Sequence, residues 1–165
     1  MPILDEHTLE FFSRSPEQTR RVGMRLGSLL QTGDMICLEG ELGAGKTTLV
    51  QGMAQGWGSL DAVTSPTFVL VNVYRRPDAT RFFHLDAYRL DSVAEAEELD
   101  IDDLLAQGPL VIEWPERIEP ILPRECMWVH LEFVADEQRT MLFAPRGQWY
   151  EQMAGDLRQA IFGVT

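Results

Sequence analysis

The residues with the clearest chemical potential form one glycine-rich stretch that fits the pattern G-x-x-x-x-G-K-[ST] in full. Its members are Gly40, Glu41, Leu42, Gly43, Ala44, Gly45, Lys46 and Thr47. The glycines let the backbone curl so that successive N–H groups point at phosphate oxygens, and a helix that begins here adds its positive N-terminal end. Lys46 supplies a mobile charge for the β- and γ-phosphates, and the hydroxyl of Thr47 is placed to ligate Mg²⁺. The pattern therefore predicts a nucleoside triphosphate site whose contacts run from Glu41 to Thr48.

The choice of nucleotide follows from lysine usage. Lys46 is the only lysine in the chain, and all other basic residues are arginines. An arginine would be too bulky and too rigidly forked to replace it in the loop. Guanine recognition in GTPases uses an Asn/Thr-Lys-x-Asp element, which cannot exist where the one lysine belongs to the loop. ATP is therefore the expected nucleotide, although the residues mark no adenine pocket.

Two carboxylates close apolar runs of the kind that form buried strands. Asp86 follows Phe-Phe-His-Leu, and Glu113 follows Leu-Val-Ile. A P-loop enzyme needs an acid at the end of a neighbouring strand to hold Mg²⁺, directly or through water. We therefore predict Lys46, Asp86 and Glu113 as catalytic residues, and Thr47, Asp86 and Glu113 as the metal shell. We assign Asp86 to the Mg²⁺ shell and Glu113 to the metal shell or the attacking water, and the sequence leaves these two roles exchangeable.

Two further polar groups belong to the neighbourhood of these acids. The stretch Ser-Pro-Thr-Phe at 65–68 stands where P-loop proteins place a segment that senses the γ-phosphate through a hydroxyl. Thr67 is the candidate there, and an ordinary turn is the rival interpretation. His84 alternates with Asp86 on a strand, so both side chains face one side of the sheet. We interpret His84 either as a satisfied core histidine or as a residue that supports Asp86.

The composition limits the kinds of partner. The 165 residues include 14 basic and 26 acidic side chains, for a net charge of −12. This balance argues against strong direct binding to tRNA or another nucleic acid, and against an anionic membrane surface. The first residues lack the basic region of a secretory signal and no apolar run is long enough to span a membrane, so we expect a cytoplasmic protein. Residues 91–103 are largely acidic and are either a solvated helix face or a docking surface for a basic partner.

Strand and helix patterns alternate along the chain and must position these residues. Apolar runs predict strands at 8–13, 35–40, 68–76, 81–89, 109–114, 125–134 and 139–144. Helical patterns cover 15–34, 41–58, 91–108 and 147–163, with Ser15 as the cap of the first helix and Gly33 as its end. The alternation predicts an α/β fold, a P-loop NTPase-like sandwich with a largely parallel central sheet and an antiparallel edge hairpin. We expect a single ATPase domain over residues 1–165.

Four segments, in this order and spacing, resemble the TsaE (YjeE) family. They are GELGAGKTTLVQG, SPTFVLVNVY, HLDAYRL and VIEWPERI, and the likeness extends from about Ser15 to about Pro145. The family consists of bacterial P-loop ATPases needed for the threonylcarbamoyl modification of adenosine, t6A, at position 37 of tRNAs that read ANN codons. This combination of segments is far more specific than the phosphate-binding loop alone.

The resemblance implies a weak Mg²⁺-dependent ATPase that works with TsaD and TsaB. In that system TsaD carries out threonylcarbamoyl transfer, and ATP hydrolysis resets the machinery between turnovers. By resemblance, Lys46 and Thr47 contact phosphate and Mg²⁺, Thr67 belongs to a switch-like segment, and Asp86 and Glu113 are the functional acids. A P-loop small-molecule kinase and a nucleotide-dependent switch without enzymatic turnover are the alternatives.

Overall fold

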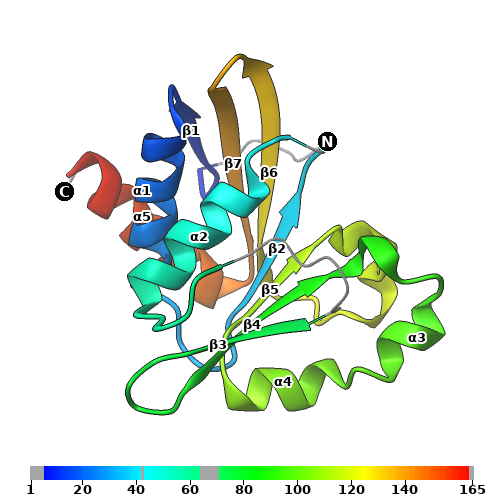
Figure 1. The fold of residues 1–165 in the computed structure, drawn as a ribbon. Helices are drawn as coiled ribbons and strands as arrows, with labels where there is room; N and C mark the ends of the chain where they lie inside the picture. The colour runs from blue at the N-terminus through cyan, green and yellow to red at the C-terminus, as the bar shows by residue number, and fades with distance from the viewer. Residues whose placement is uncertain (1–5, 42, 64–70, 164–165) are drawn as a thin grey trace.

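The computed structural model describes residues 6–41, 43–63 and 71–163, and within these ranges a sheet of seven strands forms the centre of the molecule (Figure 1). The strands are β1 (Leu9–Ser13), β2 (Met35–Glu39), β3 (Val71–Arg75), β4 (Arg81–Asp86), β5 (Leu110–Glu113), β6 (Cys126–Ala135) and β7 (Gln138–Arg146). Their spatial order is β1-β7-β6-β2-β5-β4-β3. The central strands β6, β2, β5 and β4 run parallel, and antiparallel pairs complete both edges. The predicted α/β fold with a parallel centre and antiparallel edge pairing is confirmed.

Helices cover both faces of the sheet (Figure 1). One face carries α1 (Pro16–Gly27), α2 (Lys46–Trp57) and α5 (Gln148–Phe162), and the other carries α3 (Val93–Glu97) and α4 (Ile101–Gln107). The single-turn helices are η1 (Ala87–Arg89), η2 (Pro115–Arg117) and η3 (Glu119–Ile121). Alternate residues of β2 serve the two cores: Ile36 and Leu38 pack under α1 and α2, whereas Met35 and Cys37 pack on the opposite side. This two-sided burial explains why β2 is a continuous apolar run.

Helices α1 and α2 approach closely because glycines line their contact. These glycines are Gly23 and Gly27 on α1, and Gly52 and Gly56 on α2. A Cβ atom at any of them would collide with backbone atoms of the opposite helix. The start of α1 is fixed by Ser15, whose hydroxyl accepts the N–H of Gln18 at 3.2 Å. This close contact therefore holds α2, the helix that follows the glycine-rich loop, against α1.

Two predicted helices differ from those observed. Helix α1 ends at Gly27, short of the predicted Gly33, because the Ser28 hydroxyl donates to the Arg25 carbonyl at 2.7 Å and the chain continues in tighter turns. The acidic stretch forms two helices and not one. Asp100 breaks it with a φ of 51° and caps α4 by accepting the N–H of Asp103 at 3.2 Å.

The acidic face lies where the helical pattern predicts it. All the carboxylates of residues 91–103 are exposed, while Ala96 and Ile101 point into the core. This arrangement agrees with a solvated helix face and leaves a docking role open. Among the helices that the structure describes, none combines the length and apolar character needed to cross a membrane.

Candidate nucleotide-binding site

The glycine-rich loop joins β2 to α2, as its motif requires. Gly43 and Gly45 have φ angles of 82° and 100°, in the left-handed region that favours glycine. A Cβ atom at Gly40 would lie 2.6 Å from the carbonyl oxygen of Leu131, so no side chain fits there without a shift of the backbone. The path of the loop therefore depends on the three glycines of the motif, which leave room for a ligand to approach the backbone.

The ammonium group of Lys46 is folded back over the loop. Its Nζ donates to the carbonyl of Gly40 at 2.5 Å and lies 3.9 Å from the centroid of the Trp114 ring. The residue is 6% exposed. Burial lowers the pKa of the ammonium group, and the negative charges of nearby carboxylates, Glu113 foremost, oppose this effect. Lys46 therefore lies where the loop meets the acids at the ends of the strands.

Asp86 and Glu113 are Cα partners on the neighbouring parallel strands β4 and β5. Leu38 on β2 is the partner of Glu113 on its other side, so Glu113 ends the strand next to the one that leads into the loop, and Asp86 ends the strand after that. Paired residues point to the same face of a sheet, which here is the face covered by α2. The carboxylate of Asp86 also accepts the N–H of Tyr88 at 3.0 Å. Lys46, Asp86 and Glu113, predicted from separate segments, thus meet at one edge of the sheet.

His84 contacts Glu113 and not Asp86. Its Nε2 lies 2.6 Å from Oε2 of Glu113, and its Nδ1 lies 3.1 Å from the hydroxyl oxygen of Tyr74. The histidine ring is fully buried, and the other two side chains are nearly so. The interpretation that His84 supports Asp86 is therefore wrong, because its hydrogen-bonding partner comes from the next strand.

A stack of rings and cations extends from Lys46. The Trp114 ring lies 5.0 Å from the Tyr88 ring, and the guanidinium carbon of Arg117 lies 4.7 Å from the centroid of Tyr88. Trp114 has a φ of 59°, which is unusual for a residue with a bulky side chain. Its backbone N–H donates to the Leu38 carbonyl at 3.3 Å. The strained backbone turns the indole toward the loop, where packing against Lys46 and Tyr88 offsets the cost.

Arg139 on β7 reaches the loop from another element. Its Nε donates to the carbonyl of Gly43 at 3.0 Å, while Nη1 donates to the carbonyls of Asp136 at 2.7 Å and Gln138 at 2.9 Å. These bonds tie the loop to the β6–β7 hairpin. Arg139 lies outside every motif of the sequence, and Tyr74, although it ends the segment SPTFVLVNVY, has no neighbouring residue in the sequence that marks it for a role at this site. The pairing of β3 with β4 is the signal that could have indicated Tyr74, because it puts Tyr74 and His84 on the same face of neighbouring strands.

The remaining predicted phosphate contacts divide into two groups. Thr47 and Thr48 are half-buried in the first turn of α2, directly after the loop. The carbonyl of Glu41 accepts the N–H of Ala44 at 3.0 Å within the loop. Leu42 and Thr67 lie outside the described residues, so their contacts with a nucleotide stay predictions.

The side chains that the structure describes do not make a complete metal site by themselves. Among residues 6–41, 43–63 and 71–163, no group of three or more His, Cys, Asp and Glu side chains could hold a metal by itself. Mg²⁺ in nucleotide sites is usually held by one or two protein groups together with phosphate oxygens and water. The hydroxyl of Thr47 and the carboxylates of Asp86 and Glu113 are oxygen donors of the type that Mg²⁺ prefers. They fit this requirement, and their roles on a metal stay predictions.

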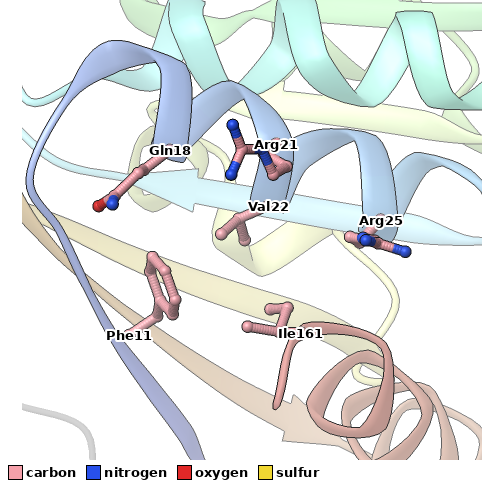
Figure 2. Close-up of a pocket in the computed structure, with 6 residues that line it drawn as sticks. All are labelled: Phe11, Gln18, Arg21, Val22, Arg25 and Ile161. Carbon is pink, nitrogen blue, oxygen red and sulfur yellow. The ribbon is translucent and has the colours of Figure 1, made fainter. Parts of the chain in front are cut away.

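A hollow of about 160 Å³ lies apart from this edge, between α1, β1 and α5 (Figure 2). It is lined by Phe11, Gln18, Arg21, Val22, Arg25 and Ile161. Its apolar side chains come from all three elements, while the two arginines project from α1 (Figure 2). None of the predicted site residues lines it, so the hollow is not part of the candidate nucleotide site.

The loop between β2 and α2, the parallel centre and the acids at adjacent strand ends define a P-loop NTPase-like protein. A family model described as "Threonylcarbamoyl adenosine biosynthesis protein TsaE" matches residues 13–141. The chain belongs to the TsaE family.

Relatives from distant bacteria agree with this membership. A Bacillus subtilis protein named "tRNA threonylcarbamoyladenosine biosynthesis protein TsaE" is 33% identical over 150 residues, which cover 90% of this chain and 93% of the relative. A Treponema pallidum protein of the same name is 38% identical over 133 residues, covering 80% of this chain and 97% of the relative. The crystal structure of Bacillus subtilis YdiB is 29% identical and superposes with a TM-score of 0.78, covering 93% of this chain and 96% of that one.

Proposed function

We propose that this protein is a Mg²⁺-dependent ATPase that serves tRNA threonylcarbamoyladenosine biosynthesis together with TsaD and TsaB. Membership of the TsaE family and the names of the relatives support the assignment to this modification. The observation that carries the ATPase part is the meeting of Lys46 with Asp86 and Glu113 at the edge where the loop begins. Such a junction of loop lysine and strand-end acids is what phosphoryl transfer to water requires.

Each residue has a defined task in this proposal. The backbone N–H groups of residues 41–48 hold the phosphates, aided by Thr67. Lys46 exchanges its bond with Gly40 for a phosphate oxygen, because an ammonium–phosphate contact is stronger than one with a neutral carbonyl. Mg²⁺, when bound with ATP, neutralises phosphate charge. Thr47 and the two acids between them would hold the ion and orient the attacking water.

The proposal also covers the setting of the reaction. The ATPase activity of the protein without its partners is weak, and ATP hydrolysis resets the TsaD–TsaB machinery between turnovers. The protein acts as one domain in the cytoplasm, and its net charge of −12 supports an indirect role without strong tRNA binding of its own. ATP is favoured over GTP because Lys46 is the only lysine and belongs to the loop.

The test is the t6A content of tRNA in cells depleted of this protein. Wild type should restore t6A, whereas K46A should fail through weakened ATP binding and E113Q through blocked hydrolysis. E119Q is a matched control, because Glu119 pairs with Arg146 at 3.2 Å and is not one of the predicted site residues. Normal t6A after depletion would overturn the assignment. If an E113Q protein that binds ATP without cleaving it sustains t6A, the protein is a nucleotide-dependent switch and not an ATPase. A phosphorylated small molecule as product would indicate a kinase.

A further inference from the structure

Three polar side chains from three adjacent strands form a buried line of hydrogen bonds that ends at the proposed catalytic edge. Tyr74 comes from β3, His84 from β4 and Glu113 from β5. The contacts are 3.1 Å between the tyrosine oxygen and Nδ1, and 2.6 Å between Nε2 and Oε2. His84 is 0% exposed and Glu113 is 6% exposed. Buried polar groups of this kind act as a unit, because each fixes the hydrogen-bonding role of the next.

The donors and acceptors of these hydrogen bonds follow from the groups at the two ends, a phenol and a carboxylate. Burial raises the pKa of Tyr74, and the negative charge of Glu113 contributes to the same shift, so the phenol keeps its proton. The carboxylate of Glu113 can only accept, so the contact with Oε2 assigns a proton to Nε2; Nδ1 of the neutral ring is then the acceptor, and the phenol donates to it. Nε2 then donates to the carboxylate of Glu113. This tautomer is assigned from the hydrogen-bond pattern.

Among the described residues, only one oxygen of the Glu113 carboxylate has a hydrogen-bond partner. Oε2 accepts from His84, whereas Oε1 makes no hydrogen bond with any residue in the described part of the chain. The carboxylate also lies near Lys46, because among the nearby carboxylates Glu113 most strongly opposes the lowering of the Lys46 pKa. A carboxylate held through one oxygen and open at the other has a fixed orientation and a free acceptor.

Core packing alone does not account for three polar groups at this place. The preceding positions on the same face, Phe82 on β4 and Val111 on β5, are apolar, whereas Asn72, the β3 partner of His84, and Asp86 at the end of β4 are polar. Apolar residues of similar volume would avoid the cost of removing a histidine and a carboxylate from water. The polar line therefore has a use at its Glu113 end, which is the end beside the loop.

We propose that His84, itself oriented by Tyr74, is a positioning residue that holds the Glu113 carboxylate in its working orientation. This inference rests on the proposed ATPase function. His84 does not contact the nucleotide. It acts by removing the rotational freedom of Glu113, so its loss lowers the rate of hydrolysis and leaves ATP binding in place.

The experiment measures kcat and KM for ATP hydrolysis in the assembled complex with TsaD and TsaB, and the Kd for ATP by calorimetry. H84L removes the donor to Glu113 and should lower kcat by roughly 10- to 100-fold, as losses of such supporting contacts do, with an unchanged Kd. H84Q keeps an N–H donor near the Nε2 position and should recover most of kcat. Y74F removes only the hydroxyl that fixes the tautomer and should lower kcat less than H84L does.

A packing control separates positioning from stability. F82L changes a buried ring that lies 5.9 Å from the Tyr74 ring but takes no part in the hydrogen bonds. It should lower the midpoint of thermal unfolding while kcat stays at the wild-type value. If H84L fails to fold, Y74F against F82L decides the question.

The outcomes distinguish this inference from the proposed function. If H84L and Y74F keep the wild-type kcat while E113Q loses it, the positioning role is wrong and the ATPase proposal stands. If H84L lowers kcat and H84Q does not recover it, the hydrogen bond to Glu113 is not the cause and the inference fails. If E113Q itself keeps the wild-type kcat, the proposed role of Glu113 in ATP hydrolysis is wrong, and the positioning role of His84 is wrong with it.

Discussion

The ammonium nitrogen of Lys46 lies 3.9 Å from the centroid of the Trp114 ring. The loop lysine is thereby held by an aromatic face and by the carbonyl of Gly40 at the same time. A cation–π contact of this kind contributes about 1–2 kcal/mol when it is shielded from water. We expect binding of ATP to draw the ammonium group away from the ring, because the terminal phosphates attract it more strongly than the indole face does.

This relationship predicts an optical signal for ATP binding. Addition of Mg·ATP should change the fluorescence emission of Trp114, because the charge next to the indole moves away. The W114F variant should lose this change while it still binds ATP, although the chain has three other tryptophans. A change of full size in W114F would show that another tryptophan reports binding and that Lys46 does not move away from Trp114.

Substitution of the loop glycines should be unfavourable, because of the backbone conformation at Gly45 and the close backbone contact at Gly40. G45A places a side chain at a φ of 100° and should cost about 1 kcal/mol or more in unfolding free energy. G40A forces a Cβ to within 2.6 Å of the Leu131 carbonyl and should also weaken ATP binding. Urea unfolding and calorimetry with Mg·ATP measure the two effects.

A third glycine provides the control for this series. Gly155 lies within α5, and a Cβ there would meet nothing within 4 Å. G155A should therefore stabilise the protein by roughly 0.5–1 kcal/mol through helix propensity and leave ATP binding unchanged. Wild-type ATP affinity in both G40A and G45A would contradict the idea that the backbone path of the loop forms the site.

The turn between β3 and β4 offers a test by titration. Hydrogen bonds from Thr80, through its hydroxyl and its N–H, lower the pKa of Asp78 to about 2, and Arg76 adds to the shift. Because the folded-state pKa lies below the unfolded value of about 3.9, ionised Asp78 contributes stability above about pH 4. This contribution is lost as the pH falls toward 2.

Carboxyl-carbon NMR shifts across an acid titration give the pKa of Asp78 directly. T80V keeps the backbone N–H but removes the hydroxyl, so it should raise this pKa toward the ordinary aspartate value. An unshifted pKa in the wild type, or no change in T80V, would contradict the hydrogen bonding of the turn.

Local patterns were sufficient to predict the parts of the site that lie within one segment. The strand–loop–helix at residues 35–57 follows from the glycine spacing and the buried run before it. The position of Asp86 and Glu113 at strand ends follows from the apolar runs that precede them. Their pairing could be anticipated only in outline, because it depends on β4 lying next to β5 in the sheet.

Contacts between segments could not be predicted in the same way. The choice of Glu113 over Asp86 as the partner of His84 depends on cross-strand register, which no periodicity in one strand reveals. The early end of α1 and the break at Asp100 depend on side-chain bonds to the local backbone, which compete with helix formation. The helical pattern by itself predicts a helix that continues through both of these positions.

The proposed function requires ATP to occupy the loop with Lys46 on its phosphates, and isothermal titration of the purified protein with Mg·ATP is the most direct test of this requirement. We predict saturable heat for the wild type, alone or with TsaD and TsaB, and a Kd raised roughly 10- to 100-fold in K46A, as expected for the loss of a charged hydrogen bond. Absence of binding heat in the wild type under both conditions, or equal affinity in K46A, would contradict it.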